Sequence, residues 1–267
     1  MFIKCGHEVV FNLRAPTPML LQLYIHPSRI PNLNQPEQMQ VEPYIPIMEF
    51  IDTYGNRCGR IVAPAGPLKL STTNIVYDTG EKDLVHPFAR QHTVGELPLD
   101  VLPFLLGSRY CEVDRFGDIA FQLFGQTQPG WARVQAICDW VHTNVKFGYQ
   151  FARPTKTAWD TFTERTGVCR DFQHLAITLC RAMNIPARYA TGYHGDIGIV
   201  PLPPPMDFSA WFEVYLDNMW YTMDARFNTP RIGRVLMGRG RDAVDCALTT
   251  SFGFADLLTF NVVAEEM

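Results

Sequence analysis

The segment Thr166-Gly167-Val168-Cys169-Arg170-Asp171-Phe172-Gln173-His174-Leu175-Ala176 places a cysteine where a helix is expected to begin. After Val168 the apolar residues follow helical spacing until Pro186 closes the run, and they are Phe172, Leu175, Ala176, Leu179 and Met183. We expect Thr166 to be the N-cap and Cys169 to lie in the first turn. Unpaired N–H groups and the helix dipole favour a thiolate there, so Cys169 is predicted to be a nucleophile and the most reactive thiol.

The flanking sequence decides between a nucleophile and a small buried hydrophobe, which is the commoner role of a free cysteine. The cysteine motif is followed by Ile185-Pro186-Ala187-Arg188-Tyr189, by Ala210-Trp211-Phe212-Glu213-Val214-Tyr215 and by Trp220-Tyr221-Thr222-Met223-Asp224. In this order the motifs resemble the core of the transglutaminase-like superfamily of cysteine enzymes, and the resemblance covers roughly Trp131 to Phe252. The similarity is to the short bacterial members. It implies an α+β, papain-like core in which the cysteine helix packs on an antiparallel sheet.

Residue by residue, the resemblance assigns the catalytic cysteine to Cys169 and the catalytic aspartate to Asp224, whereas the histidine position holds Ser209. Three explanations stay open: a natural loss that leaves a peptide-binding pseudoenzyme, another histidine that acts as the base, or an engineered change. His194 is the candidate substitute because it ends a strand that follows the cysteine helix, and its alternative is an exposed strand-end histidine. His174 lies about 140° around the helix from Cys169 and should point away.

A hairpin is predicted around Asp217-Asn218, with strands over residues 208–216 and 219–224. With a two-residue loop, Leu216 pairs with Met219, and Ser209 and Asp224 become diagonal neighbours on one face, ~7–8 Å apart. Asp224 would therefore suit the orientation of a histidine at position 209, and we expect both residues to face the cleft of Cys169. The competing interpretation is that Asp224 caps a turn.

Composition and charge indicate which partners, which compartment and which state of the thiols to expect. The chain has 267 residues with 47% hydrophobic and 19% charged residues and a formal net charge of −4, so nucleic acid and anionic membranes are not expected partners. The N-terminus lacks a signal-like apolar run, which favours a cytoplasmic protein. The seven cysteines are odd in number and scattered, which indicates reduced thiols, and their spacing implies neither a metal nor a cofactor.

We expect two domains, a β-rich domain over residues 1–95 and the catalytic-type domain over residues 96–267. Short alternating runs broken by turn signals predict an antiparallel sheet or small sandwich in the first domain. In the second, Pro129-Gly130 should open a helix that packs beside the cysteine helix, and residues 247–263 should supply an edge strand. The proline-rich residues 201–205 predict an exposed rim or lid.

A group of arginines follows the hairpin: Arg231, Arg234, Arg239 and Arg241. We expect these side chains to pair with aspartates, notably Asp242 and Asp245, instead of binding a nucleotide.

The resemblance implies amide substrates, either peptide bonds or glutamine carboxamides, and therefore a peptide or protein partner. A cysteine enzyme of this kind needs a base to accept the thiol proton, and serine is a poor base near neutral pH. The sequence thus predicts a cysteine protease or amidase that uses the Cys169 thiolate, with a peptide-binding pseudoenzyme as the alternative. The choice between hydrolysis and amide transfer stays open.

Overall fold

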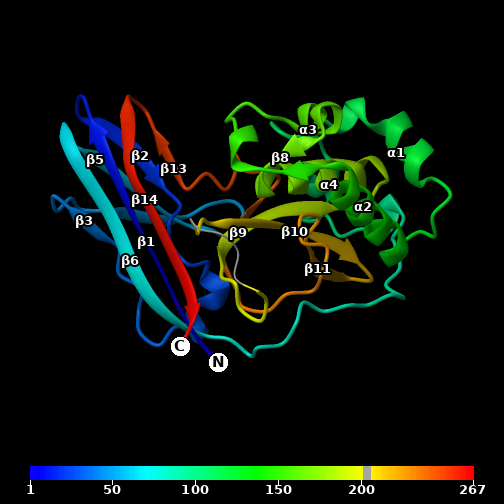
Figure 1. Ribbon diagram of the computed structural model, residues 1–267, viewed down its shortest axis with the longest axis horizontal. Coiled ribbons are helices and arrows are strands. Elements are labelled where there is room, and N and C mark those ends of the chain that lie inside the picture. The colour runs from blue at the N-terminus through cyan, green and yellow to red at the C-terminus, as the bar shows by residue number, and fades with distance from the viewer. Residues whose placement is uncertain (201–205) are drawn as a thin grey trace.

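The computed structural model describes residues 1–200 and 206–267, and it combines antiparallel sheets with a layer of helices (Figure 1). In Figure 1 the N-terminal strands stand on the left, the helices lie at the upper right, and strands β9 and β10 run between them. The predicted α+β class is confirmed. The predicted proline-rich rim at residues 201–205 lies outside the described residues.

Two antiparallel sheets form the β-rich part, with strand orders β14-β1-β6-β3 and β13-β2-β5-β4. Buried and exposed side chains alternate along much of the strands, so that one row, including Val9 and Leu70, fills a shared apolar core. The predicted small sandwich is therefore observed. Its N-terminal elements are β1 (Phe2–Leu13), β2 (Thr17–Leu21), η1 (Pro27–Asn32), β3 (Gln40–Glu42), β4 (Met48–Ile51), β5 (Arg57–Ala63) and β6 (Gly66–Tyr77).

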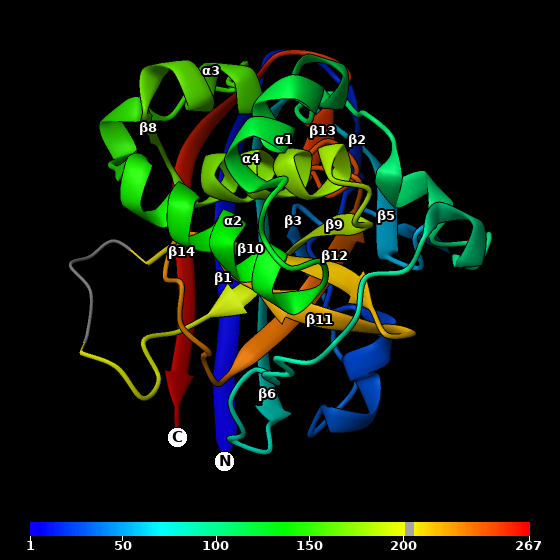
Figure 2. The ribbon, with the colours of Figure 1, turned by 90° about the vertical axis from the view of Figure 1, so that its right-hand side faces the viewer.

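The end of the chain returns to these sheets. Strand β13 (Thr249–Ser251) pairs with β2, and β14 (Ala255–Glu266) pairs with β1 along its length, which confirms the predicted edge strand. The N–H of Met267 donates to the carbonyl of Phe2 at 3.0 Å, so the two ends of the chain lie together (Figure 2). The domain division at residue 95 stays a prediction, and these two strands belong with the sheets of the first region.

The second region has helices on one face of a sheet with the order β11-β10-β9-β12 (Figure 2). Its helical elements are η2 (Val94–Glu96), η3 (Leu102–Leu105), η4 (Val113–Arg115), α1 (Gly117–Phe124), α2 (Trp131–Asn144), η5 (Tyr149–Phe151), α3 (Ala158–Glu164) and α4 (Cys169–Ala182). Its strands are β7 (Lys146–Phe147), β8 (Thr166–Gly167), β9 (Ala187–His194), β10 (Ser209–Leu216), β11 (Met219–Met223) and β12 (Arg234–Gly240).

Helix α4 is the centre of this region, because nearly every residue after its first turn is buried. It packs against α2 and α3 on one side and against β9 and β10 on the other, as the sequence predicts for α2 and the sheet. On the far face of the sheet, Tyr193 of β9 and Val235 and Met237 of β12 join the apolar core of the N-terminal strands. The apolar core of the N-terminal strands therefore continues onto this sheet and holds the two regions together.

The predicted hairpin has the predicted register. Leu216 pairs with Met219 and Phe212 with Met223. Asp217 and Asn218 have φ angles of +46° and +64°, the left-handed conformation that a two-residue hairpin turn requires and that Asp and Asn tolerate well. This turn chemistry fixes which side chains of β10 face the helix layer.

Candidate active site

Cys169 is the first residue of α4, as predicted, but the cap differs from the expected one. Val168, in extended backbone conformation, is the N-cap, and its N–H donates to Oδ2 of buried Asp171 at 2.9 Å. Thr166 was therefore the wrong N-cap, because it lies in strand β8, where its hydroxyl accepts from Lys156 Nζ at 3.3 Å. The side chain of Asp171 holds the chain entering the helix and so fixes where Cys169 starts.

Cys169 lines a pocket of about 750 Å³ at the junction of the two regions. One wall comes from the helix start, from Tyr149 and from the entry to β10, including Asp207 and Ser209. The opposite wall is apolar and comes from the first region, with Val9 and Phe11 of β1, Leu23, and Leu257 and Phe260 of β14. The structure therefore brings Cys169 and Ser209 together, and it adds a carboxyl group that the sequence analysis missed.

The thiol of Cys169 does not have the lowered pKa that the helix start was expected to produce. Burial raises the pKa of Cys169 to about 11, and the charge of Asp207 acts in the same direction. Arg226 lowers it, and so do the backbone N–H groups of Ala210 and Arg170. Removal from water thus outweighs the positive end of the helix in the resting pocket. The expected direction was wrong because burial is invisible in the local sequence.

Asp224 is buried and lines a different, smaller pocket of about 170 Å³. Its Oδ1 accepts from the N–H groups of Arg226 at 3.0 Å and Phe227 at 3.2 Å and from Nε2 of Gln173 at 3.0 Å. Its Oδ2 accepts from Arg234 Nη2 at 3.2 Å. Asp224 is not among the described residues that line the Cys169 pocket. Its carboxylate therefore holds the chain after β11 in place.

Gln173 connects this aspartate to the cysteine helix, and the sequence analysis missed it. It lies one helical turn after Cys169, fully buried. Its Nε2 donates to Asp224 Oδ1, and also to the carbonyl of Ala210 at 3.3 Å. Its Oε1 accepts from the N–H of Ala225 at 3.1 Å. The spacing of four residues from Cys169 was the available signal, because it places both side chains on one helix face.

His194 ends β9, as predicted, but it lies among cations. Its Nδ1 is 3.3 Å from Arg234 Nη1, and its ring is buried against Trp211 and Phe227. Burial, and then Arg234 and Arg231, lower the pKa of His194 to about 2. Neither His194 nor any other histidine of the described residues lines the Cys169 pocket. The expected alternative of an exposed strand-end histidine is wrong, because the side chain is buried, and the role of His194 as a base stays a prediction.

His174 points away from the cysteine, as its helical position predicts. Its ring stacks on Tyr110 at 4.9 Å between centroids, and its Nε2 accepts from the N–H of Ala243 at 3.1 Å. Burial holds its pKa well below the usual range, so it is a neutral structural residue that ties α4 to the segment after β12.

The arginine–aspartate pairing was predicted correctly only in part. Arg241 pairs with Asp245 at 2.9 Å and Arg234 with Asp83 at 3.1 Å. Arg239 instead pairs with Glu213 at 2.9 Å. Asp242 was the wrong partner, because its buried carboxylate accepts from the N–H groups of Tyr110 and Val244.

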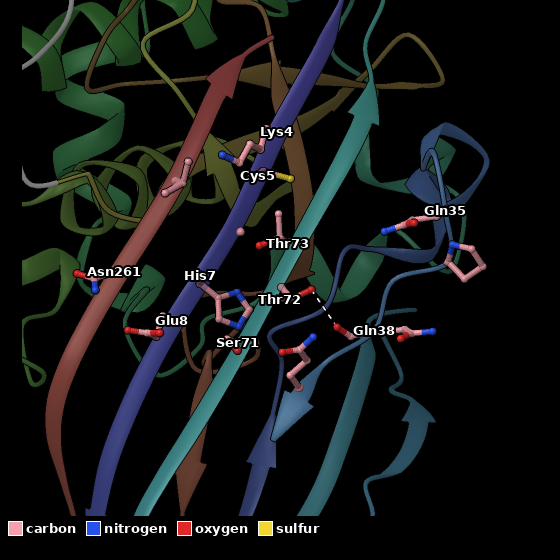
Figure 3. A pocket seen from close by; sticks show the side chains of 14 residues that line it. Lys4, Cys5, His7, Glu8, Gln35, Gln38, Ser71, Thr72, Thr73 and Asn261 are labelled. Atoms are coloured by element: carbon pink, nitrogen blue, oxygen red, sulfur yellow. Dashed lines mark hydrogen bonds between the residues drawn. The ribbon is translucent and has the colours of Figure 1, made fainter. Parts of the chain in front are cut away.

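Another pocket, of about 570 Å³, lies over strands β14, β1 and β6 and the loop before β3 (Figure 3). It also contains a cysteine, a histidine and a carboxylate, namely Cys5, His7 and Glu8 of β1. His7 Nδ1 lies 2.7 Å from the hydroxyl of Tyr193, and burial raises the pKa of Cys5 to about 12. The Cys5 thiol and the His7 imidazole are thus part of the packing between the two regions.

Among the described residues, no three or more His, Cys, Asp or Glu side chains are grouped so that they would hold a metal ion. No helix in those residues is long and apolar enough to span a membrane.

Comparisons with known proteins place these features in a family context. Residues 118–225 match the family model described as transglutaminase-like superfamily. A crystal structure from Cytophaga hutchinsonii, named "Putative Cysteine Protease", is 33% identical over 99% of this chain and 90% of its own, with a TM-score of 0.84.

Two further matches are weaker. An uncharacterized protein of Mycobacterium leprae is 27% identical over 127 residues, which are 43% of this chain and 42% of the relative, so the match spans less than half of that protein. The periplasmic domain of TgpA from Pseudomonas aeruginosa reaches 13% identity and a TM-score of 0.40, covers 84% of this chain and 90% of its own, and is too distant to carry an argument.

Proposed function

This chain belongs to the transglutaminase-like superfamily, and on that premise we propose that it is a cysteine amidase acting on peptide bonds or glutamine carboxamides through Cys169. The observation that carries the proposal is the placement of one thiol. Cys169 is half-buried at the start of α4 and lines the large pocket, whereas the other six cysteines are buried. A nucleophile must reach its substrate, and this cysteine alone combines access with a helix start.

The backbone around the thiol suits acyl chemistry. The N–H groups of Ala210 and Arg170 lie close enough to the sulfur to favour its negative charge. In the proposed reaction the sulfur attacks the amide carbon, and charge moves onto the carbonyl oxygen within the same cluster of fixed donors. These donors belong to β10 and α4, two elements packed on each other, so they are already oriented before substrate arrives.

The apolar wall formed by β1 and β14 indicates which amides fit. Phe11, Leu257 and Phe260 face the pocket of Cys169 from the opposite side. A substrate whose amide reaches the sulfur places a neighbouring side chain against this wall. We therefore propose a large apolar residue beside the scissile amide, because its burial there is favourable by about 25 cal/mol per Å² of apolar surface.

The free thiols favour a reducing compartment, since all seven cysteines are unpaired. The proposal accordingly assigns the enzyme to the cytoplasm of a bacterium.

A specific observation favours a second candidate. Ser209 provides no imidazole, and burial holds the Cys169 thiol in its neutral form near pH 7. Loss of a general base typically costs ~10²–10⁴-fold in rate. A pseudoenzyme that binds apolar peptides in the same pocket would have these two features.

The experiment that separates the two candidates follows turnover and acylation together. The wild-type protein and Cys169→Ala are incubated with fluorogenic peptides and glutamine-amide peptides that carry a large apolar residue, and intact mass is recorded. An enzyme releases product and forms a thioester adduct that Cys169→Ala lacks. Added amine then distinguishes transfer from hydrolysis. If peptides bind both proteins equally tightly and no product or adduct forms on any substrate, the pseudoenzyme is the better account.

A further inference from the structure

We propose that Asp207 is the proton acceptor for the Cys169 thiol and that Arg226 supplies the positive charge that the missing imidazolium would have provided. The inference rests on the proposed function and adds a catalytic carboxylate to it. It gives the site a Cys–Asp–Arg arrangement in place of a Cys–His–Asp triad. The role of Asp224 then changes as well, because it positions Arg226 instead of a histidine.

Asp207 is placed where a base is needed. It lies two residues before Ser209, directly ahead of β10, and it lines the same pocket as Cys169 and Ser209. Its Oδ1 accepts from the N–H of Phe208 at 2.7 Å, which fixes the carboxyl group. Its Oδ2 accepts no hydrogen bond from the part of the chain that the structure describes, so one oxygen is available for a proton.

The charges around the thiol act on one another. Asp207 raises the pKa of Cys169, and after burial it is the largest influence that raises the pKa of Tyr149. Arg226 lowers the pKa of both Cys169 and Asp207. The charges of the thiolate, the carboxylate and the guanidinium therefore influence one another's pKa values, and the phenol of Tyr149 lies in the same neighbourhood.

Burial also tunes the carboxyl group for this task. It is the largest influence on Asp207 and raises its pKa, while the Phe208 N–H and Arg226 act in the opposite direction. A carboxylate with a raised pKa is a stronger base, and its conjugate acid stays protonated long enough to serve a leaving amine.

Arg226 is held in a fixed position. Its guanidinium lies over the ring of Phe147 at 3.7 Å and over Phe227 at 4.6 Å. Its N–H donates to Asp224 Oδ1 at 3.0 Å, and its carbonyl contacts His142 Nδ1 at 2.7 Å. Asp224, itself bound to Gln173 of α4, therefore positions the backbone of Arg226 relative to the cysteine helix.

The reaction balances with these groups alone. Asp207 takes the proton of the thiol, the sulfur forms a bond to the amide carbon, and the electron pair moves to the carbonyl oxygen. When the carbon–nitrogen bond breaks, Asp207 returns the proton to the leaving nitrogen and a thioester remains. Water, or an amine in a transfer reaction, then gives its proton to Asp207 as it attacks, and the departing sulfur recovers that proton.

Asp207→Asn gives effects of opposite sign on two measurements. Removing a negative charge lowers the pKa of Cys169, so iodoacetamide alkylation at pH 8 should become ~3-fold faster. Removing the base should lower kcat/KM by ~10²–10⁴-fold and abolish the rise of activity with pH that follows ionisation of Asp207. Asp114→Asn, at an exposed aspartate of η4, is the matched control and should change neither.

Two further variants complete the design. Asp207→Glu keeps a carboxylate and should retain more activity than Asp207→Asn. Arg226→Gln should slow alkylation, because the cation that favours the thiolate is gone. Circular dichroism checks that each variant is folded.

The outcomes separate this inference from the proposed function. If Asp207→Asn accelerates alkylation and also keeps or gains activity, Asp207 is only a neighbouring charge and the inference fails while the amidase proposal stands. If alkylation does not change, the carboxyl group does not face the thiol and the inference is also wrong. If the wild-type protein turns over no substrate while alkylation still accelerates, the amidase proposal fails although the pairing of charges is correct.

Discussion

The two pockets of this protein differ in a way that residue types alone do not reveal. The pocket over β1 contains a cysteine, a histidine and a glutamate within four residues, whereas the pocket at the start of α4 contains no histidine from the described residues. A search by composition would choose the first. Yet Cys5 lies in a strand within the core, and His7 is engaged by Tyr193, so these groups serve packing.

The pocket of Cys169 has features that the pocket over β1 lacks. A helix begins at the cysteine, the N–H groups of Ala210 and Arg170 lie close to the sulfur, and the charge of Arg226 lowers the pKa of the thiol. Chemistry at a thiol depends on such oriented charges more than on the presence of an imidazole in the neighbourhood. On the proposed assignment, backbone placement distinguishes the two cysteines better than the residue types around them do.

The largest expected effect comes from exchanging the cysteines one at a time. Cys169→Ala should reduce amidase activity at least ~10³-fold, because the nucleophile is lost. Cys5→Ala, the matched change in the other pocket, should leave activity unchanged while lowering stability by ~1 kcal/mol through a small core cavity. Kinetics and thermal unfolding of both variants measure this contrast. Loss of activity in Cys5→Ala with a normal Cys169→Ala would reverse our assignment of the two pockets.

Adding the missing residue type to the correct place should give the next largest effect. Ser209→His should raise kcat/KM by ~10²-fold, since an imidazole beside Cys169 adds a better base. The same change in the Asp207→Asn background should rescue part of its lost activity. Ser209→Ala controls for loss of the hydroxyl, and Ser209→His with Cys169→Ala should be inactive. A folded Ser209→His that gains nothing on any substrate would indicate a site that differs from the triad by more than one residue.

A smaller effect tests the apolar wall. Leu257→Ala should raise KM ~3- to 10-fold for substrates with a large apolar residue, because buried contact area is lost. Leu258→Ala is the control, since this neighbour is not part of the described lining of the pocket and is similarly exposed, 63% against 54%. Steady-state kinetics on paired substrates with phenylalanine or glycine beside the amide measure the difference. Equal effects of the two variants would show that the wall does not contact substrate.

The smallest expected effect concerns His194, the substitute base suggested by the sequence. His194→Gln should change kcat/KM less than ~2-fold, because the ring lies beside Arg234 and outside the described lining of the pocket. The dependence of folding stability on pH gives the sharper test. Burial and two arginines lower its pKa to about 2, so the folded state favours neutral His194 and loses stability only as pH falls below the unfolded value of about 6.5. A folded His194→Gln without activity would establish the histidine as the base.

Local patterns were sufficient for the parts of the fold that depend on neighbours in the chain. Apolar spacing located α4, and the Asp217-Asn218 turn fixed the register of β10 and β11. The N-cap was misplaced by two residues because the side chain of Asp171, not a hydroxyl before the helix, closes the first turn.

The parts that failed depend on contacts distant in sequence. The thiol pKa is set by burial between two regions, and the isolation of His194 is set by Arg234 forty residues later. Asp207 was overlooked because the family pattern directs attention to position 209. Only the pocket shows that Asp207, two residues earlier, lines the same cavity as Ser209 and Cys169.

The pairing of β14 with β1 has a consequence for the order of events during synthesis. Strand β1 is synthesised before β14 and keeps one edge unpaired until residues 255–266 have been made. The same late strand carries Leu257 and Phe260, which complete the wall opposite Cys169. A nascent chain would thus contain Cys169 before it has the complete apolar wall of the proposed substrate pocket. Removal of β14 would take away this part of the wall and leave one edge of β1 open to pairing with other chains.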